Sequence, residues 1–211
     1  MDSGDSTMRT IGMDEVGRGA MAGPLVAAAV ALPVELALPP GLAIADSKRL
    51  NPEQRAAIAA WIHAHADVVF IERIDVAAIN RLGMGWANRA IFGRLMLRLG
   101  ACRYRVDGNL RLHGLAPLGS TIMCRCDGDV RDQAIAAASI VAKVHRDSLM
   151  RELDLTYPAY GWDRNAGYAT PEHRRAILAH GPCPEHRTLY LRRLTAEWPG
   201  ESTPIRNPRR R

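Results

Sequence analysis

The pattern of apolar and polar positions along the chain predicts both strands and helices. Short apolar runs bounded by glycine, proline or charge predict five strands, at residues 9–15, 24–33, 67–73, 101–107 and 120–126. The glycine-rich link between the first two of them predicts an antiparallel hairpin. Apolar residues at helical spacing predict helices at residues 51–65, 77–99, 133–153 and 170–181.

Local sequence signals support the prediction of two of these helices and weaken the prediction of a third. Asn51 is a candidate N-cap, Pro52 suits the first helical position, and Gln54 completes an N-x-x-Q capping box. Thr170 is the candidate cap of the last helix. The two glycines in "RLGMGW" weaken the start of the helix over 77–99.

The order of the elements indicates the fold class. Three strands come first, helices and strands then alternate, and the last third of the chain is helical, which predicts an α/β fold with a mixed sheet. We expect one core unit at residues 9–150, followed by a C-terminal helical segment at residues 151–198. Residues 1–8 and the basic residues 199–211 are predicted to be flexible tails.

The composition of the chain indicates which class of molecule it could bind. The chain has 211 residues, of which 47% are hydrophobic, so it can form a sizeable core. Its net charge of +6 suits a polyanionic partner, although a basic soluble protein without such a partner would have the same composition.

The sequence also bears on the compartment. The polar start "MDSGDSTMRT" lacks the features of a signal peptide, and no apolar run reaches the roughly 18 residues of a membrane helix. The four cysteines lack the C-x-x-C spacing of a zinc site, so we expect buried free thiols. We therefore expect a cytoplasmic protein with no membrane contact, and a monomer.

Acidic residues at the ends of predicted strands are the main candidate for chemistry. Asp14 and Glu15 end the first strand, Asp107 ends the fourth, and Asp127 and Asp129 follow the fifth. If these strands are neighbours, several carboxylates meet at one edge of the sheet. An aspartate before "GN" is also typical of a plain turn, but adjacent acids inside an apolar strand are not.

Clustered carboxylates raise one another's pKa values, and a divalent cation removes this repulsion. Mg²⁺ and Mn²⁺ prefer such hard oxygen ligands. A pair of these ions roughly 3.5–4 Å apart is a common arrangement in phosphodiester hydrolysis. The acids therefore predict a metal-dependent nuclease.

Five motifs resemble, in the same order, those of the ribonuclease HII family, the type 2 ribonucleases H. The similarity extends over residues 11–190. The motifs are "GMDEVGRGAMAGPLVAAAV" (12–30), "DSKRL" (46–50), "VDGN" (106–109), "GDVRDQAIAAASIVAKVHRD" (128–147) and "YPAYGWDRNAGYATPEH" (157–173).

The resemblance implies a ribonuclease H-like fold, with a five-stranded mixed sheet flanked by helices and a C-terminal helical extension. It also implies an endonuclease that hydrolyses the RNA strand of RNA–DNA hybrids. Such an enzyme cuts 5′ of single ribonucleotides embedded in duplex DNA and leaves 3′-hydroxyl and 5′-phosphate ends. The implied substrates are thus RNA–DNA hybrid and ribonucleotide-containing duplex DNA.

By position, the metal-binding acids of the family fall on Asp14, Glu15, Asp107 and Asp129. The last of these is preferred to Asp127 because the aspartate of the family lies ten residues before the serine of A-A-S-I. The resemblance implies two Mg²⁺ or Mn²⁺ ions at this site.

The resemblance also assigns residues that read the sugar. Gly17, Arg18 and Gly19 correspond to a segment that contacts the 2′-hydroxyl, which distinguishes RNA from DNA. Glycine permits the close backbone approach that this requires. Tyr168 corresponds to a tyrosine that packs on the deoxyribose after the ribonucleotide. The alternatives are a tight hairpin turn for the loop and a core position for the tyrosine.

Three further positions correspond to residues near the phosphates of the cut strand. Ser139 and Lys143 lie one helical turn apart, and Lys48 lies in "DSK". Lone lysines are otherwise solvated surface charges. His173 also matches the family, and we interpret it as structural.

Some positions depart from the family pattern. Asp127 and Ala166 replace lysines, and Ala78 stands where an asparagine is usual, with Asn80 nearby. Two alternatives therefore stay open: a non-catalytic protein that binds RNA–DNA hybrids, and a type HIII ribonuclease H. The second usually has an extra N-terminal domain and lacks G-R-G.

Overall fold

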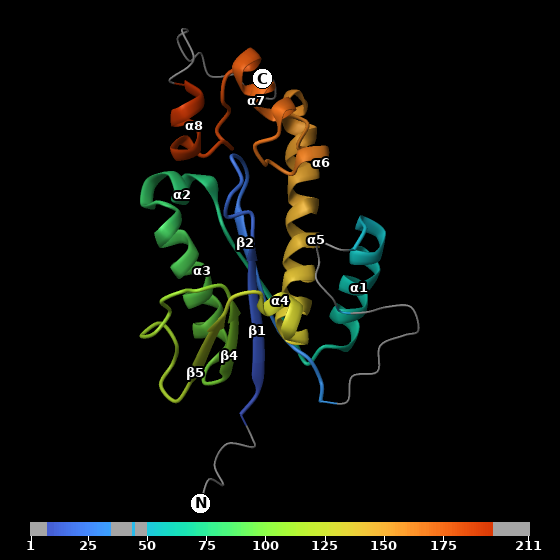
Figure 1. Ribbon diagram of the computed structural model, residues 1–211, viewed down its shortest axis with the longest axis vertical. Helices are drawn as coiled ribbons and strands as arrows, with labels where there is room; N and C mark the ends of the chain where they lie inside the picture. The colour runs from blue at the N-terminus through green and yellow to red at the C-terminus, as the bar shows by residue number, and fades with distance from the viewer. Residues whose placement is uncertain (1–7, 35–43, 45–49, 196–211) are drawn as a thin grey trace, which may run out of the picture. The chain divides into compact units, whose positions relative to one another are not determined.

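The computed structural model describes residues 8–34, residue 44 and residues 50–195 (Figure 1). Among these residues the strands are β1 (Thr10–Val16), β2 (Leu25–Ala31), β3 (Val68–Ile74), β4 (Arg103–Asp107) and β5 (Thr121–Arg125). The helices are α1 (Pro52–His65), α2 (Val76–Leu82), α3 (Met84–Leu99), α4 (Gly128–Arg131), α5 (Gln133–Thr156), α6 (Trp162–Asn165), α7 (Pro171–His180) and α8 (Thr188–Thr195), with a 3-10 turn η1 (Pro158–Tyr160).

The chain divides into two compact units. The sheet unit comprises the described residues of Met1–Val16, Val26–Arg73 and Asn88–His145, and the helical unit those of Gly17–Leu25, Ile74–Ala87 and Arg146–Arg211. The division near residue 150 that the sequence suggests stays a prediction. Almost all of the two predicted tails lies outside the described residues.

The sheet is mixed, with the strand order β3-β2-β1-β4-β5. β1 pairs antiparallel with β2 and parallel with β4, and β4 pairs parallel with β5. The predicted hairpin, the five strands and the mixed α/β sheet are thereby confirmed. The order brings the ends of β1 and β4 side by side, which is what the carboxylate hypothesis requires.

Helices pack on both faces of this sheet. All seven residues of β2 are buried, as an uninterrupted apolar sequence predicts for a strand covered on both sides. On one face, a Cβ at Gly12 would lie 2.1 Å from the backbone of Ala134, so α5 packs directly on β1. On the other face, the hydroxyl of Tyr104 on β4 donates to the carbonyl of Met96 on α3.

The predicted capping box of the first helix is confirmed. The side chain of Asn51 accepts from the backbone N–H of Gln54 at 2.8 Å, and the Gln54 side chain accepts from the N–H of Asn51 at 3.0 Å. Thr170 caps α7 in the same manner, since its hydroxyl accepts from the N–H of His173. These bonds satisfy backbone donors that the first turn of a helix leaves unpaired.

The single helix predicted over residues 77–99 is wrong. Gly83 has a φ of +84°, which ends α2, and α3 begins at the next residue. Glycine adopts this conformation without the steric cost that other residues carry. The two helices therefore meet at a break that the apolar pattern alone does not reveal.

The four cysteines are free, as expected, but not all are buried. Cys102 and Cys183 are buried, Cys124 is half-buried and Cys126 is exposed. The last lies one residue past the end of β5, so it leaves the sheet instead of packing on it. Among the described residues, each helix is too short or too polar to cross a bilayer.

The helical unit has a core of its own. Aromatic and aliphatic side chains from α5 to α8 pack there against the loop that follows β1. The buried members are Met21, Ala22, Met150, Tyr160, Trp162, Ile177, Cys183 and Leu191.

The contact between β1 and α5 can be tested at Gly12. Replacing Gly12 by Ala should lower the free energy of unfolding by about 1–3 kcal/mol, because the new methyl group would overlap the backbone of Ala134. Chemical denaturation measures the change. Gly85→Ala is the control: that position is open and helical, so it should be neutral or gain up to about 1 kcal/mol. Equal effects at both positions would contradict the packing described.

Candidate active site

Asp14 and Glu15 lie near the end of β1 in the sheet unit. The side chain of Asp14 is buried and that of Glu15 half-buried. Across the hairpin they pair with Ala28 and Ala27, whose short side chains leave room for the carboxylates. Oδ1 of Asp14 accepts from the N–H of Glu15 at 2.7 Å. The hydroxyl of Ser139 on α5 also hydrogen-bonds to Asp14.

The electrostatics of Asp14 differ strongly from those of an exposed aspartate. Burial raises the pKa of Asp14 to about 8, and the negative charges of Glu15 and Asp107 raise it as well. The hydrogen bonds from Ser139 and the Glu15 N–H act in the opposite direction, but burial outweighs them. Without a cation nearby, this carboxyl group therefore keeps its proton at neutral pH.

Asp107 and Asp129 approach from β4 and α4. Asp107 follows Val106, which pairs with Met13, so it ends its strand beside Asp14. Its Oδ1 accepts from the N–H of Gly128 at 2.7 Å and so holds the start of α4. Asp129, in the first turn of α4, is 5% exposed.

The choice between Asp127 and Asp129 has a structural counterpart. Asp127 is exposed, has a positive φ of 57° and makes no capping hydrogen bond. Asp129 is buried in the same unit as Asp14 and Asp107. The two acids therefore differ in burial, and the choice of Asp129 as the fourth acid stays a prediction.

The described side chains of the sheet unit do not form a complete set of metal ligands. Within residues 8–34, 44 and 50–195, no group of three or more His, Cys, Asp or Glu side chains is arranged to hold a metal ion. What the structure brings together is Asp14 with Glu15 and Asp107, which repel one another electrostatically. Their oxygens are of the kind that Mg²⁺ and Mn²⁺ prefer, so the donor set fits these ions.

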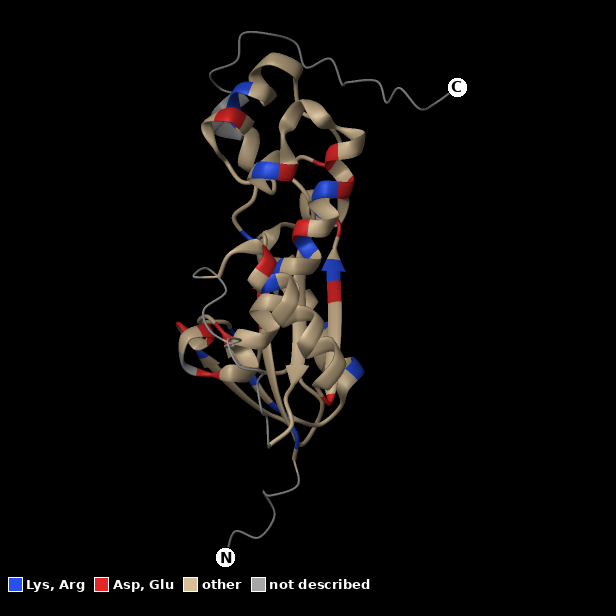
Figure 2. Cartoon of the chain, turned by 90° about the vertical axis from the view of Figure 1, so that its right-hand side faces the viewer, with Lys and Arg blue, Asp and Glu red and all other residues tan. Residues whose placement is uncertain are grey.

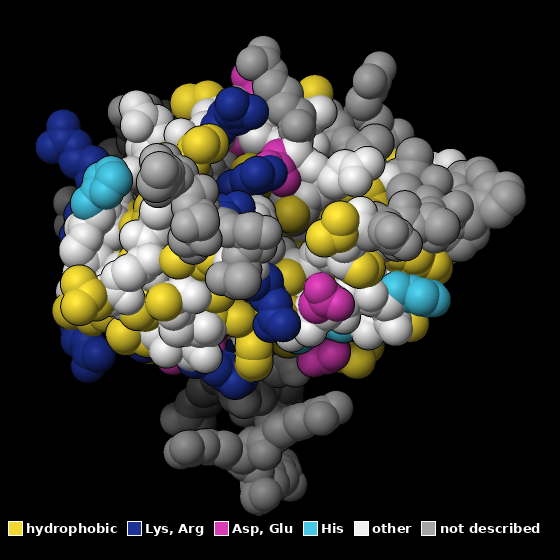
Figure 3. All heavy atoms as spheres, turned by 90° about the horizontal axis from the view of Figure 1, so that it is seen from below, with side chains coloured by type: hydrophobic (Ala, Val, Ile, Leu, Met, Phe, Trp, Pro, Cys, Tyr) yellow, Lys and Arg dark blue, Asp and Glu magenta, His cyan; other side chains and the backbone are white. Residues whose placement is uncertain are grey.

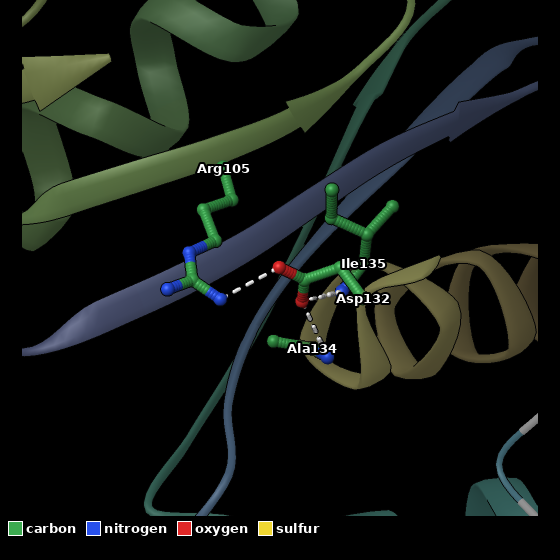
Figure 4. A network of polar contacts seen from close by, with 4 residues as sticks. All are labelled: Arg105, Asp132, Ala134 and Ile135. Carbon is green, nitrogen blue, oxygen red and sulfur yellow. Dashed lines mark hydrogen bonds and ion pairs between the residues drawn. The ribbon is translucent and has the colours of Figure 1, made fainter. Parts of the chain in front are cut away.

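An ion pair fixes the start of α5 next to this centre (Figure 4). Asp132 precedes the helix, and its Oδ1 accepts from the N–H groups of Ala134 and Ile135 at 3.0 and 3.3 Å. Its Oδ2 accepts from Nη1 of Arg105 on β4 at 2.7 Å. Arg105 lies two residues before Asp107 on the same face of the strand. The carboxylate of Asp132 therefore ties the helix that carries Ser139 to the strand that carries Asp107.

The phosphate-contact candidates on α5 lie on one face of the helix. Ser139 is buried and reaches Asp14, and Lys143, one turn further along, is half-buried. Lys48 lies outside the described residues.

The glycine-arginine loop belongs to the helical unit. Gly17 has a φ of +88°, and a Cβ there would lie 2.1 Å from Nε of Arg146. Arg18 and Gly19 are exposed, and the space around Gly19 is open. The fold requires a glycine at position 17 but not at position 19, so the exposed Gly19 is accessible to a ligand.

Tyr168 is half-buried, and its ring centroid lies 5.5 Å from the guanidinium carbon of Arg146. The carbonyl of Tyr168 is bonded to Nδ1 of His173 at 2.8 Å, so this nitrogen carries the proton. Nε2 of His173 then accepts from Nε1 of Trp162 at 3.0 Å. His173 thus connects Tyr168 to the core of the helical unit, in agreement with the structural role that we expect.

His186 completes this arrangement. Its Nδ1 accepts from the N–H of Cys183 at 3.0 Å, so its protonated Nε2 faces Nε2 of His173 at 3.1 Å. Burial lowers the pKa of His186 to about 3, and His173 lowers it as well. Burial lowers the pKa of His173 as well, so burial favours the neutral form of both imidazoles.

Two residues with many contacts in this region escape the sequence analysis. Arg146 and Arg187 are fully buried, and both hydrogen-bond to the loop after β1. Neither residue is apolar, and neither belongs to a group of residues that are spaced like metal ligands. No local signal predicts their burial, because their partners in the loop after β1 lie more than 120 residues away in the chain.

Sequence comparison identifies the family. The family model for ribonuclease HII matches residues 11–194. A curated ribonuclease HII from Synechococcus sp. (strain JA-3-3Ab) is 44% identical over 190 residues, which cover 89% of this chain and 85% of that protein.

Solved structures agree on the fold. Ribonuclease H2 from Pyrococcus horikoshii OT3 aligns with a TM-score of 0.75 at 22% identity, over 90% of this chain and 98% of that one. The structure of Bst-RNase HIII in complex with Mn²⁺ aligns with a TM-score of 0.59 at 22% identity, over 82% of this chain and 63% of that one. The chain therefore belongs to the ribonuclease HII family and is an endonuclease that cuts RNA strands.

Proposed function

We propose that this enzyme hydrolyses the RNA strand of RNA–DNA hybrids and cuts duplex DNA 5′ of single embedded ribonucleotides. Two Mg²⁺ or Mn²⁺ ions held by Asp14, Glu15, Asp107 and Asp129 serve the reaction. The observation that carries this proposal is the buried Asp14 carboxyl, whose pKa is raised to about 8 beside two further acids. Such a group becomes a stable anion when a divalent cation offsets the repulsion.

Each acid has a distinct part in this proposal. Divalent ions held by these acids would supply a metal-activated water and would offset the charge that develops on the leaving 3′ oxygen. Asp14 interacts electrostatically with both Glu15 and Asp107, so its carboxylate would be the central one among the acids that hold the ions. Ser139 orients that carboxylate by a hydrogen bond, and Lys143 supplies positive charge for a phosphate of the cut strand.

The loop that follows reads the sugar. In the chain, only Val16 separates Glu15 from Gly17, the first residue of the loop. The exposed Arg18 and Gly19 present backbone groups and a cation to the 2′-hydroxyl and an adjoining phosphate. Tyr168 offers an aromatic face to the following deoxyribose, which favours cleavage at RNA-to-DNA junctions.

The charge of the chain suits this polyanionic substrate. The net charge is +6, and acidic and basic residues are interspersed along the helices (Figure 2). Figure 3 shows several basic side chains on the face seen from below, with acidic side chains among them. Contacts between basic side chains and phosphates make the affinity for nucleic acid depend on salt concentration.

The proposed activity is tested with end-labelled duplex DNA that contains one ribonucleotide, in the presence of Mg²⁺ or Mn²⁺. The enzyme should produce one cut, 5′ of the ribonucleotide, with 3′-hydroxyl and 5′-phosphate ends. Asp14→Asn should reduce the rate by at least about a hundredfold, because the carboxylate that offsets the metal charge is lost. Hybrid binding should survive.

Asp129→Asn and Asp127→Asn form a matched pair in the same assay. The first should lose cleavage like Asp14→Asn, and the second should keep it, because Asp127 is exposed and asparagine tolerates a positive φ. Full activity of Asp14→Asn or Asp129→Asn would refute the assignment of the acids.

The raised pKa of Asp14 also predicts a pH dependence of stability. Since this pKa is about 8 in the folded chain and 3.8 in the unfolded one, the folded state holds the proton more firmly. The stability that this proton contributes to the folded state is fully present below pH 3.8 and is lost as the pH rises through 8. Without metal, Asp14→Asn should therefore melt at about the same temperature as the parent at pH 4.

At pH 8, Asp14→Asn should melt about 2–4 °C or more above the parent, which corresponds to at least about 1 kcal/mol. Adding Mg²⁺ or Mn²⁺ at pH 8 should stabilise the parent and leave the variant nearly unchanged. Scanning calorimetry in chelator and in metal measures both effects, with Asp127→Asn as the control. A parent that melts at the same temperature with and without the metals would argue against the proposed site.

A further inference from the structure

Two arginines with no exposed surface lie beneath the loop that follows β1. Arg146 on α5 and Arg187 before α8 are both 0% exposed. Their guanidinium groups donate hydrogen bonds to backbone carbonyls, and Arg187 is also hydrogen-bonded to the side chain of Tyr190. Burial of a charge is costly unless its hydrogen-bonding groups are satisfied, so these carbonyls are the partners that keep both cations in place.

Arg187 holds the glycine-arginine loop from its inner side. Its Nη1 donates to the carbonyls of Gly17, Arg18 and Ala20 at 2.6, 3.2 and 3.0 Å. Its Nε and Nη2 donate to the carbonyl of Gly23 at 2.9 and 2.7 Å. Because these carbonyls converge on one guanidinium, the peptide planes of the loop are fixed, and Arg18 is left exposed on the outer side.

Arg146 connects the same loop to the segment that carries Tyr168. Its Nε and Nη2 donate to the carbonyls of Pro24 and Ala22, both at 3.0 Å. Its Nη1 donates to the carbonyl of Ala166 at 2.9 Å, and its guanidinium carbon lies 5.5 Å from the ring centroid of Tyr168. One side chain therefore contacts both substrate-reading segments.

Backbone contacts join the same two segments. The N–H groups of Met21 and Ala22 donate to the carbonyl of Gly167 at 2.8 and 3.2 Å. A Cβ at Gly167 would lie 2.6 Å from the carbonyl oxygen of Ala22, so only glycine permits this approach. The hydroxyl of Tyr190 donates to the carbonyl of Arg18 at 2.8 Å and adds a third anchor.

We propose that Arg146 and Arg187 are positioning residues that hold residues 17–24 and residues 166–168 in one rigid frame. The ribose-reading loop and the deoxyribose-reading tyrosine then act together, and selectivity for a ribonucleotide followed by DNA depends on both arginines. This inference rests on the substrate-reading roles in the proposed function.

Lysine cannot replace arginine in this arrangement. A guanidinium is planar and offers five donors in fixed directions, whereas an ammonium is a compact charge with three donors. Arg146→Lys and Arg187→Lys therefore keep the charge but leave several carbonyls of the frame unpaired. The loop should lose its fixed conformation, although the overall charge of the protein is unchanged.

The experiment compares these two variants with Arg174→Lys, the same change at an exposed position of α7. Two ratios are measured for each protein. The first is kcat/KM for a single ribonucleotide in DNA relative to a continuous RNA–DNA hybrid. The second, in chelator, is the affinity for a fluorescent duplex with one ribonucleotide relative to the all-DNA duplex. Thermal melting reports the fold.

Both ratios should fall by about tenfold or more in Arg146→Lys and Arg187→Lys, because charge-assisted hydrogen bonds that fix the loop are lost. Arg174→Lys should keep the ratios of the parent. Tyr190→Phe removes one hydroxyl, which contacts the carbonyl of Arg18 and the side chain of Arg187, so it should fold like the parent and lower both ratios by a smaller factor. It tests the same frame if a lysine variant does not fold.

Unchanged ratios in the folded lysine variants and in Tyr190→Phe would overturn the proposal. A parent protein that binds both duplexes equally in chelator would overturn it too. A parent that binds selectively but does not cut would refute the proposed catalysis instead, and the binding ratios of the variants would still decide the role of the arginines.

Discussion

Burial of a carboxyl group beside other acids is the constraint on which the sheet unit depends. Asp14 is buried at the end of β1, with Glu15 next to it and Asp107 at the end of the neighbouring strand. An isolated carboxylate in such a place would be protonated, and three ionised groups would force the strands apart. A divalent cation reconciles burial with ionisation, so the destabilised apo site and its proposed chemistry have the same origin.

The rest of the sheet unit keeps these groups from separating. Hydrogen-bonded pairing of β1 with β2 and β4 fixes the strands, and Gly12 allows α5 to approach β1 closely. Asp132 joins that helix to β4 through Arg105. These contacts hold the strands and the helix that carry the acids close to one another.

The sequence predicts local and periodic features well, and long-range polar contacts poorly. The hairpin of β1 and β2, the Asn51 capping box and acids at strand ends follow from patterns that span a few residues. The burial of Arg146 and the exposure of Cys126 do not, because both depend on where distant segments or a strand end lie. The break at Gly83 lies between these cases: glycine weakens the helix prediction, but only the φ of +84° shows where the helix ends.

The most direct test of the central claim counts the protons released when Mg²⁺ binds. Titration calorimetry at pH 7 in buffers of different ionisation enthalpy measures this number. If Asp14 holds a proton in the apo protein and loses it to the metal, the parent should release about one proton per chain, and Asp14→Asn nearly none. Binding without proton release in the parent, or equal release by both proteins, would contradict the account.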